Sequence, residues 1–419
     1  MDTANLILLF IAMLLVAAML QPLSQFLKLP HSLLLVLAGF IGSEVVVSLG
    51  VDTGLRWYHF HTLVFYIFLP ALIFESALHI DLKALLKKLF PILLLSTPMM
   101  LLATLVSAAF LYWGIGYPDY FPWLAALLCG ALLSATDPAA VISLFKKVGV
   151  SDEVILLLEG ESLFNDAVAI LLFGLFSSLL LMPGETFSVT YAVERFALVF
   201  LGGTLVGVIT FALMATLFLF IRDNFARMIF MVSATYGGYL VAESVLHLSG
   251  VMSVLVAGLG FGELLRRENK NGSTAKDQSE KLAELWRFNG QLAETLIFLL
   301  LGMTITWGMF EQQWLAMLLG IAAVLISRAA GLLVTMPVIN LFSGSLSSGT
   351  KVNWQEQIVL YWGGVRGAVT IALALSLPLE LESWFTIQSI AYGVVLFSLC
   401  IQTSTTPLLV KAIKLKRNK

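Results

Sequence analysis

Long apolar stretches alternate with short polar or turn-rich ones along most of the chain. Several apolar stretches reach about 18 residues, the length that an α-helix needs to cross a bilayer. Glycine, proline and charged residues mark the connections between them. The pattern predicts thirteen spanning helices, which we place at residues 5–20, 32–50, 62–79, 90–113, 121–145, 153–182, 190–221, 226–246, 250–265, 289–309, 312–340, 355–377 and 386–412.

The composition agrees with this class. Hydrophobic residues make up 59% of the 419 positions and charged residues 12%, with a mean hydropathy of +0.95. No soluble fold needs that much apolar surface, so we expect an all-α polytopic membrane protein with a single integral membrane domain over 1–419, embedded in the lipid bilayer. Residues 266–288 are the one long polar insertion, and we predict a cytoplasmic loop there. No zinc, iron or haem spacing is present, so we expect no cofactor. We also expect no enzyme activity and no nucleic-acid partner.

Lysine and arginine orient the predicted helices. With thirteen spans, 20 of the 24 basic residues fall in loops on the side of the C-terminus, and only Arg56 and Arg195 on the other. Arg328 and Arg366 lie within spans. Because cytoplasmic loops of membrane proteins are enriched in Lys and Arg, we predict an outside N-terminus and a cytoplasmic C-terminus.

Two predicted spans contain internal breaks. The fifth contains Thr136-Asp137-Pro138, where proline removes a backbone donor and disfavours helical geometry before it. The twelfth contains Gly363-Gly364-Val365-Arg366-Gly367, where glycines loosen the backbone. The two spans cross in opposite directions, since they are seven apart. Paired interruptions in oppositely oriented halves are typical of a transporter binding site.

Carboxylates and hydroxyls gather at the first break and in the next span. Ser162 and Asp166 are four residues apart, on one helical face. With Thr136 and Asp137 they offer the oxygen ligands that a hard alkali cation prefers, and we predict a Na⁺ site of these four residues. An ionisable group inside the membrane is costly, and desolvation lets a buried carboxylate hold a proton. One site can therefore hold either a proton or a cation.

Two arginines need partners at membrane depth. We predict that Arg366 forms a structural ion pair with Glu161, which lies off the Ser162 face. Arg328 is matched with Glu294 in the preceding span. Glu75 lies either on the ion's path or at a helix end, where its side chain would reach toward water.

These motifs together resemble the NhaP/NHE branch of the monovalent cation/proton antiporters, over essentially the whole chain. The matching stretches are Ala135-Thr136-Asp137-Pro138, Glu159-Gly160-Glu161-Ser162-Leu163-Phe164-Asn165-Asp166, Gly363-Gly364-Val365-Arg366-Gly367-Ala368 and Phe74-Glu75. The resemblance implies an inverted-repeat fold of about 13 transmembrane helices and a parallel homodimer. It also implies a moving six-helix core, placed by segment order at 90–182 and 312–412, with 1–89 and 190–309 as dimerisation, scaffold and linker helices.

The expected function is electroneutral exchange of one Na⁺ or Li⁺ for one H⁺ by alternating access, serving pH homeostasis and sodium transport. Asn165 supports electroneutrality, because the resemblance implies a second aspartate at this position in electrogenic relatives. The chain as given continues little beyond the last predicted span, and on that ground we expect a prokaryotic cytoplasmic membrane.

Other functions are open at this stage. A potassium or broad alkali-cation/proton antiporter of the same fold fits the same ligands, because selectivity depends on cavity size and ligand field. An intramembrane aspartyl protease would use Asp137 and Asp166 but would call for a Gly-x-Gly-Asp pattern, which is absent. A cation channel would need a repeated filter or re-entrant pore loop, whereas inverted broken helices favour alternating access.

Overall fold

The computed structural model describes residues 3–27, 29–48, 62–116, 121–181, 189–221, 223–269, 273–342 and 351–413, and every regular element in these ranges is a helix. The helices are α1 Thr3–Leu27, α2 His31–Ser48, η1 Val64–Phe68, α4 Leu69–His79, α5 Leu82–Lys87, α6 Leu89–Ser96, α7 Pro98–Gly114, α8 Trp123–Ser134, α9 Ala139–Val148, α10 Asp152–Leu181, α11 Val189–Phe220, α12 Asn224–Val232, η2 Ser233–Gly237, α13 Gly238–Leu240, η3 Val241–Val245, α14 Gly250–Glu268, α15 Ser273–Thr304, α16 Trp307–Phe342, α17 Trp354–Trp362, α18 Ala368–Leu375, α19 Trp384–Phe397, η4 Ser398–Gln402 and α20 Thr403–Ile413.

The helical architecture predicted from the hydrophobic pattern is confirmed. Among the described residues, eight helical stretches are long and apolar enough to cross a bilayer. Val64–His79 and Trp123–Ser134 are shorter apolar helices. The span count of thirteen stays a prediction, and residues 49–50 and 182 of the predicted spans lie outside the described ranges.

The predicted loop over 266–288 is wrong for most of its length. α14 continues to Glu268, and α15 begins at Ser273 and runs unbroken into the next predicted span; residues 270–272 lie outside the described ranges. Leu282 and Trp286 in this polar stretch are fully buried. Their spacing of four residues places them on one helix face, and this amphipathic pattern stabilises a helix although the segment is too polar to read as a span.

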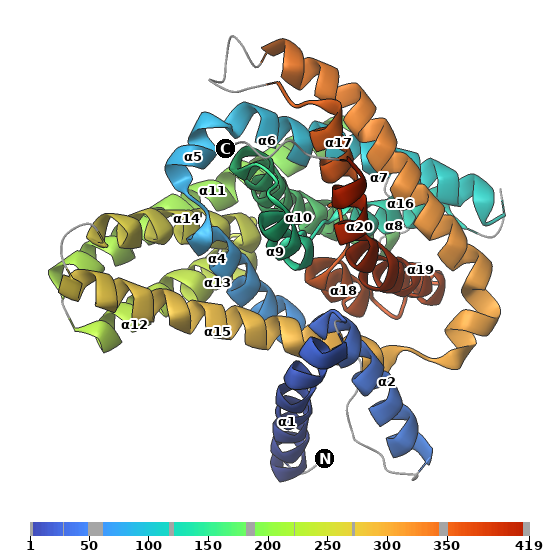
Figure 1. Cartoon of the computed structure of the whole chain (residues 1–419), viewed down its shortest axis with the longest axis horizontal. Helices are drawn as coiled ribbons and strands as arrows, with labels where there is room; N and C mark the ends of the chain where they lie inside the picture. The colour runs from blue at the N-terminus through green and yellow to red at the C-terminus, as the bar shows by residue number, and fades with distance from the viewer. Residues whose placement is uncertain are drawn as a thin grey trace.

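The helices pack as two neighbouring groups. α16 packs against α7 and α19, α7 against α8, and α8 against α10. In the other group, α14 packs against α4 and α11, and α15 packs along α2 and α4. Figure 1 shows α11 to α14 on the left and α16 and α19 on the right, with α15 running across the lower part of the view to α2. The groups follow the sequence ranges of the predicted core and scaffold, whose relative movement stays a prediction.

Short polar caps set the ends of several helices. The side chain of Asp81 accepts hydrogen bonds from the first N–H groups of α5. Asn353 and Glu356 form a capping box at the start of α17. α9 ends at Gly149, whose φ of 85° is the left-handed conformation that favours glycine. The last two of these caps belong to α17 and α9, which each flank one of the two predicted breaks.

Candidate ion-binding site

Both predicted breaks are present, and they contact each other. Residues 135–138 separate α8 from α9, and residues 363–367 separate α17 from α18. The backbone N–H of Asp137 donates to the carbonyl of Val365 at 2.7 Å. The two interrupted helices therefore cross where each has lost its internal hydrogen bonds.

The carboxylate of Asp137 joins the two breaks. Its Oδ1 accepts from the N–H of Ala139 at 3.1 Å, and its Oδ2 accepts from the N–H of Ala368 at 3.3 Å. These donors belong to the first residues of α9 and α18, where helical N–H groups have no partner within the helix. The positive ends of two helix dipoles thus point at one carboxylate.

Because Gly367 has no side chain, the Asp137 carboxylate has room beside it. A Cβ atom at Gly367 would overlap both the Cβ atom and the carboxylate of Asp137. The glycine in the second break is therefore required by close approach to a side chain of the first break.

α10 supplies polar side chains to the first break. The hydroxyl of Ser162 donates to the carbonyl of Thr136 at 2.5 Å. The amide of Asn165 donates to the carbonyl of Ser134 at 2.8 Å and to the hydroxyl oxygen of Thr136 at 3.3 Å. The carbonyls at the end of α8 have no partner within that helix, and side chains of α10 donate hydrogen bonds to them. These bonds hold α10, which carries Asp166, against the break.

Asp166 follows directly after Asn165 on α10. Its Oδ1 is buried, and within the described part of the chain the carboxylate forms no hydrogen bond or ion pair. Asp137 and Arg366 lie within electrostatic range of it. A buried polar group without a partner is costly, so Asp166 is the group in this site that a cation or a proton would most stabilise.

The predicted ion pair between Glu161 and Arg366 is wrong. Both terminal nitrogens of Arg328 donate to the two carboxylate oxygens of Glu161, with the Nη2–Oε2 distance at 3.0 Å. Arg328 also donates to the carbonyl of Leu360, two residues before the end of α17. The side chains of Glu161 and Arg328 are 1% and 5% exposed, so the pair lies in the protein interior and connects α10, α16 and α17.

Arg366 instead donates hydrogen bonds to carbonyls of the broken helix. Its Nη1 donates to the carbonyls of Ser134 and Ala135 at 3.0 and 2.9 Å, and Ala135 also accepts from the hydroxyl of Thr370. A helix that stops leaves its last carbonyls unpaired, and a guanidinium with five donors can satisfy several of them. The carbonyls of the broken helix therefore take the place of the carboxylate that we expected as the partner of Arg366.

Glu75 and Glu294 lie outside this contact network. The carboxylate of Glu75 has its partner on its own helix, His79 Nδ1 at 3.3 Å. The predicted pairing of Arg328 with Glu294 is wrong, because Glu161 occupies that guanidinium. Asp137 lies within electrostatic range of both glutamates.

The sequence does not indicate that Ser398 and Gln402 lie at the site. The hydroxyl oxygen of Ser398 accepts from the backbone N–H of Arg366 at 3.2 Å, and Ser398 donates to Gln402 Oε1 at 2.6 Å. Both are buried in η4, a π-helical turn within an apolar stretch. π-Helical turns are frequent at functional sites, but nothing in the apolar pattern indicates one.

Comparison with known proteins agrees with this geometry. Residues 10–412 match the family model described as the sodium/hydrogen exchanger, transmembrane. The Na(+)/H(+) antiporter ApNhaP of Aphanothece halophytica is 36% identical over 405 residues, which are 96% of this chain and 73% of that protein. The low-affinity Na(+)/H(+) antiporter NhaS1 of Synechocystis is 35% identical over 389 residues, which are 93% of this chain and 70% of that protein.

A solved structure shares the fold. The sodium proton antiporter MjNhaP1 from Methanocaldococcus jannaschii superimposes with a TM-score of 0.79 at 20% sequence identity, and 99% of each chain is covered. A second structure of that protein, from electron microscopy, gives a TM-score of 0.69 at 21% identity. The match of the family model over nearly all of the sequence shows that this chain belongs to the transmembrane sodium/hydrogen exchanger family.

Proposed function

We propose that this protein exchanges one Na⁺ or Li⁺ for one H⁺ across the membrane, with Asp166 as the carboxylate that binds them in turn. The observation that carries the proposal is the unpaired state of Asp166 beside carboxylates that have partners. Glu161 is bound by Arg328, and both oxygens of Asp137 accept helix N–H groups. The family and the names of its members support sodium as the cation.

Oxygen atoms beside Asp166 can complete a cation site. Ser162 Oγ and the carbonyl oxygen of Thr136 lie 2.5 Å apart, close enough to contact one ion. A hydroxyl that donates one hydrogen bond still has lone pairs for a cation. With Asp137 and Asp166, these residues form a ligand set of oxygens alone, as a hard cation prefers.

The proposed cycle moves no net charge. If Asp166 alone changes its occupant, it carries a proton in one direction and a monovalent cation in the other, and the charge of the Asp166 carboxylate is balanced in each case. Asp137 would keep one charge throughout, because the N-termini of α9 and α18 both stabilise a carboxylate there. Asn165, which is uncharged, adds no second titrating group. The ratio of one to one follows from these three side chains.

Alternating access would come from movement of the core, 90–182 and 312–412, against the scaffold. The two broken stretches and α10 all belong to this core, so the site would move as a unit while its hydrogen bonds stay intact. We place the protein in a prokaryotic cytoplasmic membrane as a parallel homodimer, with the N-terminus outside and the C-terminus inside. The apolar surface of α11, which is largely exposed, supports an environment of lipid or a second copy.

The test is a reconstituted exchange assay. Liposomes containing the purified protein and a pH-sensitive dye are given Na⁺, Li⁺ or K⁺, and proton movement is followed. We expect Na⁺ and Li⁺ to move protons and K⁺ to be inactive. Equal responses to K⁺ would replace sodium by a broad alkali-cation specificity, and a complete lack of cation-dependent proton movement would refute antiport.

A further inference from the structure

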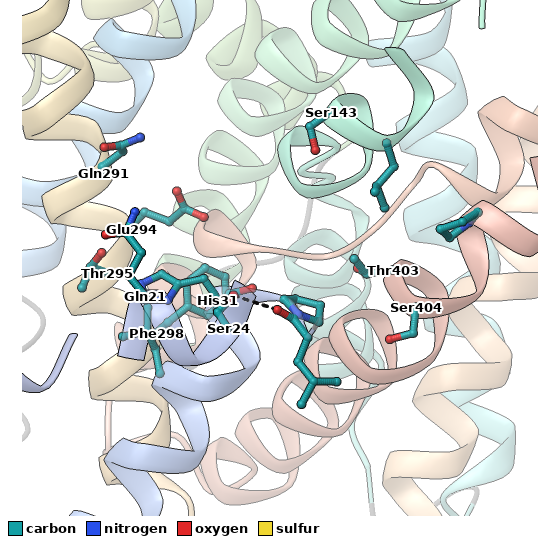
Figure 2. Close-up of a pocket in the computed structure, with 16 residues that line it drawn as sticks. Gln21, Ser24, His31, Ser143, Gln291, Glu294, Thr295, Phe298, Thr403 and Ser404 are labelled. Atoms are coloured by element: carbon teal, nitrogen blue, oxygen red, sulfur yellow. Dashed lines mark hydrogen bonds between the residues drawn. The ribbon is translucent and has the colours of Figure 1, made fainter. Parts of the chain in front are cut away.

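A cavity of about 800 Å³, with both polar and apolar residues in its lining, lies between the two groups of helices. Its polar lining comes from both sides: Gln291, Glu294 and Thr295 on α15 face Ser143 on α9 and Thr403 and Ser404 on α20. Figure 2 shows the Glu294 side chain pointing away from α15 into this space. α1 and α2 close the cavity on the side of His31.

Glu294 is the one carboxylate of this cavity lining. Within the described ranges, no hydrogen bond or ion pair involves its side chain, whereas Glu75 nearby pairs with His79. An unpaired carboxylate at membrane depth costs several kcal/mol on most scales and marks ion pathways. It also concentrates cations in a cleft with low-dielectric walls.

The cavity and the site described above share helix α9. Ser143 in its wall lies on α9, and Asp137 caps the first turn of the same helix. Ser143 lies four residues after Ala139, the first residue of α9, which is a rise of about 6 Å along the helix. Glu75 approaches α15 at Gly290, one turn before Glu294, because that position has no side chain. Asp137 and Glu75 both lie within electrostatic range of Glu294.

We propose that Glu294 is an accessory binding station for the alkali cation, on the scaffold side of the cavity, from which the cation passes to Asp166. This role rests on the proposed exchange function. The ligands would be the Glu294 carboxylate together with water and the hydroxyls of the cavity wall, so binding is weak and the cation leaves readily. A station of this kind raises the local cation concentration and does not take part in the exchange itself.

Kinetics separate this role from a structural one. Glu294→Gln should raise the apparent KM for Na⁺ several-fold with little change in kcat, and Glu294→Asp should restore the lower KM. The matched control is Glu284→Gln, at an exposed position on the same helix, which should behave as the unmodified protein. An unchanged KM in Glu294→Gln, or a loss of kcat alone, would overturn the proposal.

A direct measurement of Na⁺ binding tests the role of Glu294 without a transport assay. In detergent-solubilised Asp166→Asn protein, ²³Na NMR line broadening should still report weak Na⁺ binding, and the added change Glu294→Gln should remove it. Residual binding that survives Glu294→Gln, or none in Asp166→Asn alone, would refute the station. If the unmodified protein shows no exchange, the proposed function fails, while this binding comparison still tests Glu294.

Discussion

Arg328 on α16 binds both carboxylate oxygens of Glu161 on α10, and Arg366 is thereby left to the carbonyls of the broken helix. Each buried arginine has a separate task. Arg328 neutralises a carboxylate next to the site, and Arg366 replaces the hydrogen bonds that the break removed. Arg366 lies within electrostatic range of Asp166, whose Oδ1 has no partner among the described residues, and we propose that this carboxylate binds the transported ion.

Neutralising Asp166 should abolish exchange. Asp166→Asn keeps the size of the side chain and removes its charge, so it can bind neither a proton nor a cation in the proposed way. We expect no Na⁺-dependent proton movement in liposomes from a protein that is folded and inserted. Asp152→Asn, at the exposed first turn of the same helix, is the control and should retain exchange. Substantial activity in Asp166→Asn would refute the assignment.

The Glu161–Arg328 pair should show strong energetic coupling. Removing one partner of a buried ion pair costs about 3–5 kcal/mol, because the other charge is left unpaired. Glu161→Ala and Arg328→Ala should each lower the thermal stability in detergent, and the double variant should lose less than the sum. The same cycle with Arg366 in place of Arg328 should show weaker coupling. The reverse order of the two couplings would contradict the structure.

Adding one methyl group at Gly367 should damage the site. Its Cβ would overlap Asp137, and overpacking of this kind costs about 1–3 kcal/mol. We expect Gly367→Ala to lower the melting temperature and impair exchange. Gly174→Ala is the control, because nothing lies within 4 Å of a Cβ there and alanine favours the helix by about 0.5–1 kcal/mol. Equal stability of the two variants would show that Asp137 can move away at no cost.

The cap of α5 should give stability that depends on pH. The N–H of Ala84 and the charges of Arg266 and Lys83 hold the pKa of Asp81 below its usual range. A carboxylate with a lowered folded-state pKa stabilises the fold above its unfolded pKa, and this contribution is lost as the pH falls through the folded pKa.

Asp81→Ala removes this cap and should cost about 1 kcal/mol at neutral pH. The difference in melting temperature between the variant and the unmodified protein should shrink on acidification, because the protonated carboxyl caps less well. Melting curves at neutral and acidic pH check this. A difference that stays constant across this range would show that the charge of Asp81 plays no part.

The sequence predicted the helices and the breaks because both depend on local chemistry. Apolar length indicates a span, and proline or several glycines interrupt one, so residues 135–138 and 363–367 could be placed without a structure. The partners of Glu161 and Arg366 could not, because two arginines lie within spans and apolar length does not show which one faces Glu161.

Polar residues within helices are also difficult to interpret from the sequence alone. Residues 273–288 look like a loop by composition, but Leu282 and Trp286 bury one face of a helix there. Ser398 and Gln402 lie in an apolar run, yet Ser398 accepts from the backbone N–H of Arg366 and donates to Gln402. Such features depend on which helices become neighbours, and a single sequence does not show this.

The central claim is that Asp166 alone changes its occupant, so that exchange is one to one and electroneutral. The direct test is the Na⁺ distribution that reconstituted protein reaches at a fixed pH gradient, under potassium/valinomycin potentials of either sign. One net charge per cycle would couple about 2.3 kcal/mol per 100 mV to that distribution. We predict the same final Na⁺ ratio at every potential, and a ratio that shifts with the imposed voltage would contradict the account.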